Sequence, residues 1–463
     1  MSATSDLSAL LRIITNGITA IESSCAKRGV HYPSLDDALT LDSVAIQESL
    51  VEEALPVIAA AYQVVATLMS PQSFQQKMLY GQTVAIGVAE AGHVAEILRE
   101  AGPKGLHASE IAKHTTLDPR RLAHCLRILT TLHVFKETSP DVFTNNRVSA
   151  VLDTGKTVKE IVADPQAKYD GAPGLAALTG TNTDEFLKGA GHAVAMLTDP
   201  ATSHSQEPVD SPLQRAFGKK MGLFDWYDLP ENQFRLRRFG NAMRGVQWKA
   251  SILGGFDWSA LPQGSVVVDV GGGLGGLDLD LAKEHKHLKY IYQDRPQTVE
   301  QADKMWRDQG NQDVIDGIVK FQPHDFFGPQ PVENAAVFLM RYILHDWSDP
   351  YCIKILSQLR ASATPDTKLV VIDALLQNNC PSDGKWKHIR GGEAEIAPAP
   401  LLPNFGIAKS DEAYVDILLM SVTNTQERTL DEVNALFEAT GWKLERVHRF
   451  PPPSIPQVVA VPA

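Results

Sequence analysis

The segment Ser265–Gly276, which reads SVVVDVGGGLGG, decides the fold of this chain. Its valine run predicts a strand that is buried on both faces, as strands of parallel sheets are. The glycines that follow allow the backbone to turn sharply and to approach a ligand closely. A helix is expected from about Leu277 to Lys286, so that its N-terminus faces the same crevice. A strand, a glycine turn and a helix in this order predict a nucleotide-type binding site.

The glycine cluster by itself leaves the identity of the ligand open. Gly271, Gly273 and Gly276 satisfy the G-x-G-x-x-G pattern of dinucleotide sites, which suggests NAD. Asp269 followed by Gly271, Gly273 and Gly275 equally satisfies the acidic-x-Gly-x-Gly-x-Gly spacing that is typical of S-adenosylmethionine (SAM) loops. A tight strand-to-helix turn that binds no ligand is the third interpretation. The rest of the chain has to decide among the three.

Composition limits the classes of function. A chain of 463 residues with 44% hydrophobic and 21% charged residues predicts a packed protein of two or three domains. Its net charge of −12 argues against a nucleic-acid partner, because phosphate contacts need basic patches. The sequence shows no signal peptide and no apolar run of the roughly 18 residues that cross a membrane. The four cysteines have no metal-type spacing and predict reduced thiols, so a cytoplasmic location is expected: Cys25, Cys125, Cys352 and Cys380.

The order of expected elements predicts four regions. Residues 1–75 form a helical N-terminal extension, and residues 76–165 form a winged helix with two short helices and a hairpin. A winged helix can bind DNA, but the acidic charge argues against this, and in SAM-dependent enzymes such a module more often serves dimerisation. Residues 166–250 form a helical connector that lines the substrate. Residues 251–463 alternate strands with helices, which predicts an α/β fold with a Rossmann-like, doubly wound sheet.

Polar residues at the carboxyl ends of these strands are the candidate site residues, since ligands of such sheets bind there. Asp294, Asp325 with Phe326, and Arg341 are expected near the cofactor. His345, in RYILHDWSDP, follows the fourth strand, and its ordinary pKa of about 6.5 suits a general base. A structural role, in which His345 only satisfies a buried carbonyl, is the alternative. Two carboxylates, Asp373 and Glu427, are expected to flank and orient the imidazole.

Large apolar side chains between residues 217 and 248 have two interpretations. At helical spacing such residues usually form a core, but aromatic rings and methionines also line pockets for flat aromatic substrates. The candidates for substrate contact are Phe224, Trp226, Phe239, Met243 and, further along the chain, Ile417.

Taken in order, DVGGGLGG, YIYQD, HDFF, RYILHDWSD, VVIDALL and NTQERT resemble the caffeate- and flavonoid-type O-methyltransferases of plants and fungi. The resemblance extends from about Pro212 to the C-terminus, and more loosely over the winged helix. It implies a SAM-dependent enzyme that methylates phenolic hydroxyls, needs no metal and forms homodimers through its N-terminal region. It departs from the plant members at two positions, where Asp373 replaces Glu and Arg341 replaces Lys.

The same resemblance implies roles for individual residues. His345 matches the catalytic base, and Asp373 and Glu427 match the carboxylates beside it. The SAM contacts match Gly271, Asp294, Asp325 and Phe326, and the substrate-lining segment matches Phe239 and Met243. For the methyltransferase, the expected acceptor is a phenolic or polyketide-like small molecule. Some fungal proteins that resemble this family have been recruited as pericyclases that bind SAM without methyl transfer, so pericyclase activity is the alternative.

Overall fold

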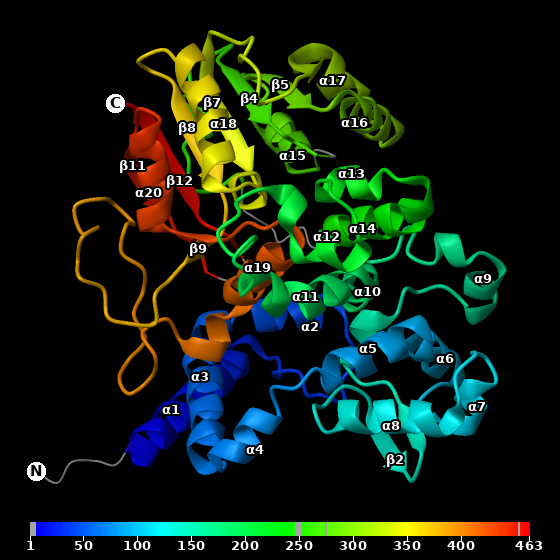
Figure 1. Ribbon diagram of the computed structural model, residues 1–463. Helices are drawn as coiled ribbons and strands as arrows, with labels where there is room; N and C mark the ends of the chain where they lie inside the picture. The colour runs from blue at the N-terminus through cyan, green and yellow to red at the C-terminus, as the bar shows by residue number, and fades with distance from the viewer. Residues whose placement is uncertain (1–5, 246–251, 274–275, 452–453) are drawn as a thin grey trace, which may run out of the picture. The chain divides into compact units, whose positions relative to one another are not determined.

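The computed structural model describes residues 6–245, 252–273, 276–451 and 454–463, so Leu274 and Gly275 of the glycine segment lie outside the described residues. Its contacts divide the chain into two units (Figure 1). Unit 1 comprises residues 1–198 and 212–247, and unit 2 comprises residues 199–211 and 248–463. Both inner boundaries expected from the sequence, at residues 75/76 and 165/166, fall inside unit 1, whereas residues 199–211 belong to unit 2.

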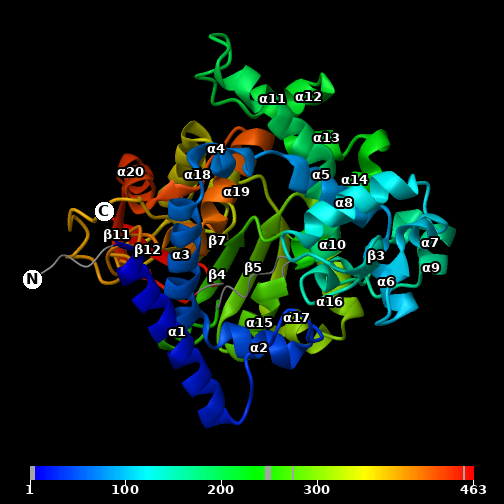
Figure 2. The same cartoon turned by 90° about the horizontal axis from the view of Figure 1, so that it is seen from below.

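The N-terminal part of unit 1 is a helical pair. Helices α1 (Asp6–Arg28) and α3 (Val51–Leu68) pack along each other, and α2 (Leu41–Glu48) and α4 (Pro71–Gln76) complete this part (Figure 2). A Cβ at Gly17 of α1 would collide with Val57 of α3, so glycine allows the close approach of the two helices.

Helix α3 is the one helix of the described residues that could cross a membrane by length and composition alone. It is 18 residues long with a mean hydropathy of 1.3. Glu52 and Glu53 interrupt its apolar run in the first turn, so the uninterrupted run stays shorter than the roughly 18 residues that cross a membrane. A single helix of this kind is weak support for a membrane span, because core helices pass the same test.

A winged helix follows, as the sequence predicts. Helices α7 (Ala108–Ala112) and α8 (Pro119–Thr130) pack with a three-stranded sheet of order β1-β3-β2, formed by β1 (Leu106–His107), β2 (Lys136–Ser139) and β3 (Val142–Thr144). Asp118 is the N-cap of α8, and its carboxylate accepts hydrogen bonds from the amides of Arg120 and Arg121, both at 3.0 Å. This cap satisfies amide groups that the helix itself leaves unbonded.

The stretch Val84–Glu100 is divided between two helices. Helix α5 (Gly81–Ala91) ends at Gly92, and α6 (Val94–Ala101) begins after His93, whose φ of 55° is left-handed. A left-handed residue breaks the helical ladder, so the two helices take different directions.

The remainder of unit 1 is helical. In chain order it contains α9 (Val158–Ala163), α10 (Leu175–Thr181), the π-helical turn η3 (Asn182–Phe186), α11 (Leu187–Leu197), α12 (Pro212–Phe217), α13 (Leu223–Tyr227) and α14 (Gln233–Gly245). Buried ion pairs hold this part together and to the winged helix: Arg238 of α14 pairs with Glu185 of η3, and Lys168, which lies between α9 and α10, pairs with Glu90 of α5.

Unit 2 is built on a seven-stranded sheet of order β11-β12-β8-β7-β4-β5-β6. Its strands are β4 (Val266–Val270), β5 (Lys289–Asp294), β6 (Val319–Pro323), β7 (Ala335–Arg341), β8 (Lys368–Ile372), β11 (Trp442–His448) and β12 (Gln457–Pro462). Strands β4 to β8 pair in parallel, and β12 and β11 continue the sheet in antiparallel pairing. Since the strand order reverses direction at β4, this is the doubly wound, Rossmann-like sheet that the sequence predicts.

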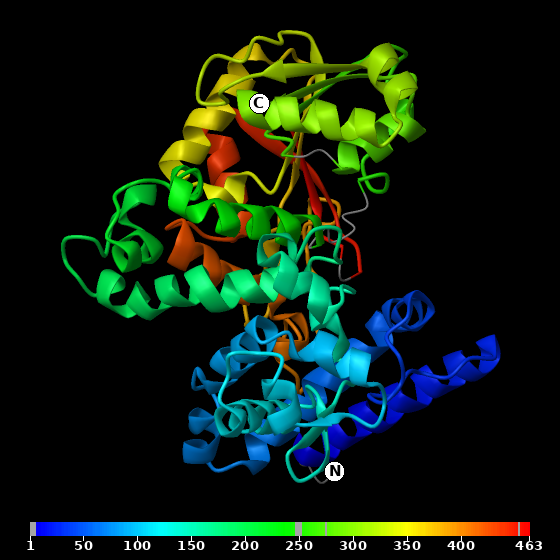
Figure 3. The ribbon, with the colours of Figure 1, turned by 90° about the vertical axis from the view of Figure 1, so that its right-hand side faces the viewer.

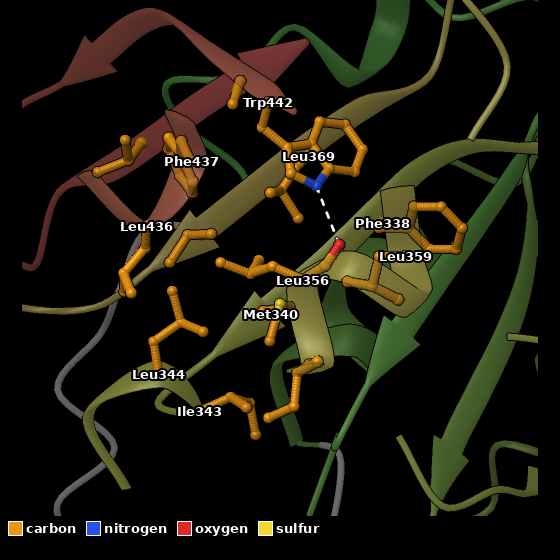
Figure 4. Close-up of a cluster of buried hydrophobic side chains, with 14 of the residues drawn as sticks. Phe338, Met340, Ile343, Leu344, Leu356, Leu359, Leu369, Leu436, Phe437 and Trp442 are labelled. Carbon is orange, nitrogen blue, oxygen red and sulfur yellow. Dashed lines mark hydrogen bonds between the residues drawn. The ribbon is translucent and has the colours of Figure 1, made fainter. Parts of the chain in front are cut away.

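Helices cover both faces of this sheet (Figure 3). Helices α18 (Asp349–Ser362) and α20 (Leu430–Ala439) pack on one face. Helices α15 (Gly276–Glu284), α16 (Pro296–Asp308) and α17 (Gln312–Ile318) pack against strands β4, β5 and β6. Figure 4 shows the core under α18 and α20, where the indole of Trp442 donates a hydrogen bond of 3.2 Å to the carbonyl of Leu356. The central valines predicted to be buried on both faces are confirmed, because Val267, Val268 and Val270 are at most 1% exposed.

Side-chain hydrogen bonds attach residues 199–211 to unit 2. The Ser348 hydroxyl donates to the carbonyl of Gln206 at 2.7 Å, and the Tyr351 hydroxyl donates to Glu207 at 2.7 Å. The amide group of Asn424 donates to the carbonyls of Ser205 and Glu207. Ser348, the N-cap residue of α18, therefore uses its hydroxyl here and makes no side-chain cap of that helix.

Candidate active site

The glycine loop after β4 has the geometry of a ligand cradle. The amides of Gly271 and Gly272 donate to the carbonyl of Gln293 at 2.8 and 3.1 Å, which ties the loop to β5. Gly271 has φ of +77°, and a Cβ there would lie 2.5 Å from Ile343 and 3.4 Å from Phe326. A Cβ at Gly272 would collide with the carboxylate of Asp269 and the ring of Tyr292. Only glycines therefore fit these two positions.

Beyond these positions the loop opens. A Cβ at Gly273 would meet nothing within 4 Å, and its amide donates to Asp294 Oδ2 at 2.9 Å. Asp294 ends β5, and its other oxygen accepts a hydrogen bond from the amide of Arg295 at 2.7 Å. The structure thus places a carboxylate beside an open, glycine-lined edge, which suits the ribose hydroxyls of a nucleoside. The residues present fit SAM on this ground.

The other expected cofactor residues lie at neighbouring strand ends. Asp325 follows β6, is exposed, and accepts a hydrogen bond from the amide of Phe327 at 3.0 Å. The ring of Phe326 lies beside Gly271 and packs edge-on against Trp347 with ring centroids 5.9 Å apart. Arg341, the last residue of β7, places its guanidinium carbon 5.5 Å from the centre of the Tyr342 ring.

His345 lies on a short 3-10 turn, η7 (Leu344–Asp346), which begins three residues after the last residue of β7. The chain enters this turn through Tyr342, which has a left-handed φ of 55° and whose amide still donates to the carbonyl of Ile372 at 3.1 Å. A left-handed conformation is costly for an aromatic residue, and such strain collects at functional sites. The sharp turn directs His345 toward the carboxyl ends of the strands.

The two expected carboxylates converge on this turn but take different partners. Glu427 Oε1 lies 2.8 Å from His345 Nδ1, and the Glu427 side chain is 2% exposed. Asp373, which follows β8, instead accepts a hydrogen bond from the amide of Leu344 at 3.2 Å. The same small cavity is lined by His345, Asp373 and Glu427. The structure therefore brings the three residues together, with Glu427 on the imidazole and Asp373 on the backbone of the turn.

The electrostatics of the cluster favour a charged imidazole. Burial opposes the charge of His345, but the nearby Asp346 and the hydrogen-bonded Glu427 outweigh it and raise the pKa of His345 from 6.5 to about 10. Burial raises the pKa of Asp373 from 3.8 to about 7, against the attraction of His345. Burial also raises the pKa of Asp346, whose Oδ1 lies 3.7 Å from His345 Nε2.

Two residues of the site were missed by the sequence reading. The ring of Tyr342 stacks on His345 with centroids 5.3 Å apart and an interplanar angle of 27°. Arg428, directly after Glu427, is 3% exposed and bonds the backbone of the same turn. Their positions in RYILHDW and QERT, next to the expected catalytic residues, were the only signal in the sequence.

The expected substrate residues divide between the two units. In unit 1, Trp226 is 1% exposed and packs against Phe217 with ring centroids 4.6 Å apart, which is the core role that the sequence left open. Phe239 stacks on Tyr227 at 5.0 Å. Phe224 of α13 is half-buried and Met243 of α14 is 41% exposed, whereas Ile417 lies in unit 2, on α19 (Asp411–Val422).

Groups of histidine, cysteine or acidic residues with metal-site geometry do not occur in the part of the chain that the structure describes. The four cysteines are unpaired, as expected.

Fold and site together define a SAM-dependent methyltransferase, with a glycine cradle and a carboxylate–imidazole pair at the carboxyl edge of one sheet. Residues 196–390 match the O-methyltransferase domain family. The chain is 40% identical to an O-methyltransferase of Armillaria gallica over 99% of both chains. It is 39% identical to 4-O-methyltransferase 1 of Phanerochaete chrysosporium over 96% of both. The chain belongs to this O-methyltransferase family, and its cofactor is SAM.

Among solved structures, one titled a pericyclic reaction enzyme superposes with a TM-score of 0.67, covering 92% of this chain and 100% of its own, at 18% identity. At this identity the likeness shows the shared fold alone. The pericyclase alternative therefore gains no support from it, since one fold hosts different activities.

Proposed function

We propose that this enzyme transfers the methyl group of SAM to a phenolic or enolic hydroxyl of a small aromatic or polyketide-like metabolite, with His345 as the general base. The observation that carries the proposal is the 2.8 Å contact between His345 Nδ1 and the buried Glu427 at the edge of the sheet where the glycine cradle lies. A carboxylate only accepts, so Nδ1–H donates to Glu427 and leaves Nε2 free of that contact to take a proton.

The geometry explains the proton transfer. A phenol has a pKa of about 10, so it is a poor nucleophile at neutral pH unless its proton is removed as it attacks. Glu427 holds the imidazole in one tautomer and stabilises the imidazolium that forms. The pKa of His345, raised to about 10, makes the neutral imidazole a strong base, and since only this neutral form accepts the phenol's proton, the rate should rise with pH until the imidazole has lost its proton. When bound, SAM supplies an electrophilic methyl group on a sulfonium sulfur.

The remaining site residues are proposed to bind the two substrates. Gly271, Gly273 and Asp294 would hold the ribose and amino-acid portions of SAM, with Asp269 under the loop. Asp325, Phe326 and Arg341 are proposed for the adenine side. Candidates for contact with the aromatic acceptor are Phe224, Phe239 and Met243 in unit 1 and, separately, Ile417 in unit 2; Trp226 is no longer one of them, because it is 1% exposed. The name of the Phanerochaete relative, which specifies a hydroxyl at position 4, supports a hydroxylated acceptor.

The test is transfer of labelled methyl from SAM to a panel of phenols by wild-type enzyme and the His345→Gln variant. General-base catalysis contributes about 10²–10⁴-fold, so we expect a loss of that size in kcat with SAM affinity, measured by calorimetry, unchanged. His448→Gln, a change on β11 outside the site, is the matched control. Normal turnover by His345→Gln would show that His345 is not the base. If the wild-type enzyme transferred label to none of the phenols, the proposal of a phenolic acceptor would be rejected.

We also propose that the enzyme is a cytoplasmic homodimer that forms through its N-terminal helices. Helices α1 and α3 expose large apolar side chains, which would be covered in a dimer: Leu7, Leu11, Ile18, Ile58, Tyr62, Val65 and Leu68. Analytical ultracentrifugation of the wild type and of a Leu11→Glu, Leu68→Glu variant tests the dimer, since the variant should be monomeric. A fluorescent fusion tests the location.

A further inference from the structure

Arg428 binds the backbone at both ends of the turn that carries His345. Its Nη1 donates to the carbonyl of Leu344 at 2.6 Å, and its Nη2 donates to the carbonyl of Trp347 at 2.8 Å. Leu344 directly precedes His345, and Trp347 follows it by two residues. The planar guanidinium therefore spans the two ends of a four-residue segment with His345 inside it.

The guanidinium is itself held in place. Its Nε and Nη2 donate to Asp349 Oδ1 at 3.1 and 2.8 Å. Arg428 lies in the short strand β10 (Arg428–Thr429), which pairs in parallel with β9 (Leu375–Leu376), two residues beyond Asp373. The backbone of Arg428 is thus fixed to the strand end that carries one site carboxylate, and its neighbour Glu427 bonds the imidazole.

Leu344 is fixed in three directions by these contacts. Its side chain is 2% exposed and lies in the core that Figure 4 shows. Its amide donates to Asp373, and its carbonyl accepts hydrogen bonds from Arg428 and from the buried thiol of Cys352, at 3.3 Å for the thiol. The Cys352 thiol also contacts the carbonyl of Trp347 at 3.2 Å, the second carbonyl that Arg428 binds. The turn that carries His345 is therefore held at both of its ends.

We infer that Arg428 is a positioning residue for methyl transfer, which holds the Leu344–Trp347 turn so that His345 meets Glu427 and the acceptor in one geometry. The inference rests on the proposed role of His345 and goes beyond it, because Arg428 acts through the backbone and not on the reacting atoms. A displacement of about 1 Å in a catalytic group can cost roughly 10²-fold in rate, so a loosened turn should have a large effect.

The test uses Arg428→Lys, which keeps the charge and most of the volume but replaces a two-carbonyl fork by a single ammonium. We expect kcat for labelled methyl transfer to fall about 10–100-fold, with the dissociation constant of SAM within about twofold of wild type. Arg449→Lys is the matched control, because Arg449 also bonds two carbonyls, those of Gly391 and Gly392, away from the His345 turn. It should leave kcat unchanged.

A double-variant cycle separates positioning from general stability. If Arg428 acts through His345, adding Arg428→Lys to His345→Gln should cost at most about twofold further, because the group that it positions is already gone. A full, multiplicative loss would overturn the inference, and so would a folded, SAM-binding Arg428→Lys enzyme with normal kcat. Failure of the base proposal looks different, since His345→Gln alone would then turn over normally.

A second variant keeps the inference testable if Arg428→Lys does not fold. Asp349 is 49% exposed and accepts hydrogen bonds from Nε and Nη2 of Arg428, so its removal frees the guanidinium to move off the two carbonyls. Asp349→Ala should lower kcat several-fold without changing SAM affinity, and normal kcat in this variant would overturn the inference.

Discussion

Replacement of Glu427 by Gln should move the pH dependence of the enzyme toward acid. The glutamine keeps a hydrogen-bond acceptor of the same shape beside His345 Nδ1 and removes only the charge. An opposite charge at this distance, 2.8 Å between Nδ1 and Oε1, shifts a pKa by about 1–3 units. At 1.36 kcal/mol per unit, the imidazolium would lose about 1–4 kcal/mol of stabilisation.

From the value of about 10 for wild type, the pKa of His345 should therefore fall to roughly 7–9 in Glu427→Gln. The ascending limb of kcat/KM against pH reports the base of the free enzyme and should move by the same amount. At high pH, where the imidazole is neutral in both enzymes, the variant should be about tenfold slower because its base is weaker. Near pH 7 the variant has more neutral imidazole but a weaker base, and these two effects on the rate oppose each other. The whole pH profile is therefore needed to test the prediction, because a rate at one pH does not separate them.

The assay is labelled methyl transfer to the best phenol of the panel, with kcat and KM measured from about pH 6 to 10.5. Glu438→Gln, an exposed change on α20, is the matched control and should leave the profile in place. A Glu427→Gln profile that superimposes on wild type would refute the reasoning, since His345 would then not owe its basicity to this carboxylate.

Two further predictions concern stability and the cofactor loop. His345 binds its proton more tightly in the folded chain than in the unfolded chain, so its contribution to stability is fully present below about pH 6.5 and is lost as the pH rises toward about 10. Thermal unfolding should show wild type losing stability relative to His345→Gln across that window, by about 1 kcal/mol per pH unit, and parallel curves would contradict it. Gly272→Ala should weaken SAM binding at least about tenfold in calorimetry. The added Cβ collides with Asp269 and Tyr292 and must displace the loop. Unchanged affinity would show that the loop does not hold SAM.

Local sequence determined the elements and their order. The buried valines of β4 and the glycines after them act within a few residues, and the structure confirms the strand and the turn. The capping box of Thr429 and Glu432 is equally local. The position of His345 after β7 follows from the same strand pattern. Such features depend on backbone geometry and nearby side chains, which the sequence states directly.

The tertiary structure alone decided which groups meet and how they are charged. Glu427 reaches His345 across 82 residues, while Asp373, expected beside the imidazole, bonds the amide of Leu344. The left-handed break at His93, the attachment of residues 199–211 to unit 2 and the clamp made by Arg428 also depend on contacts between distant segments. The pKa of His345 rises to about 10 because the carboxylates of Asp346 and Glu427 outweigh the opposing effect of burial, and no local pattern encodes that balance.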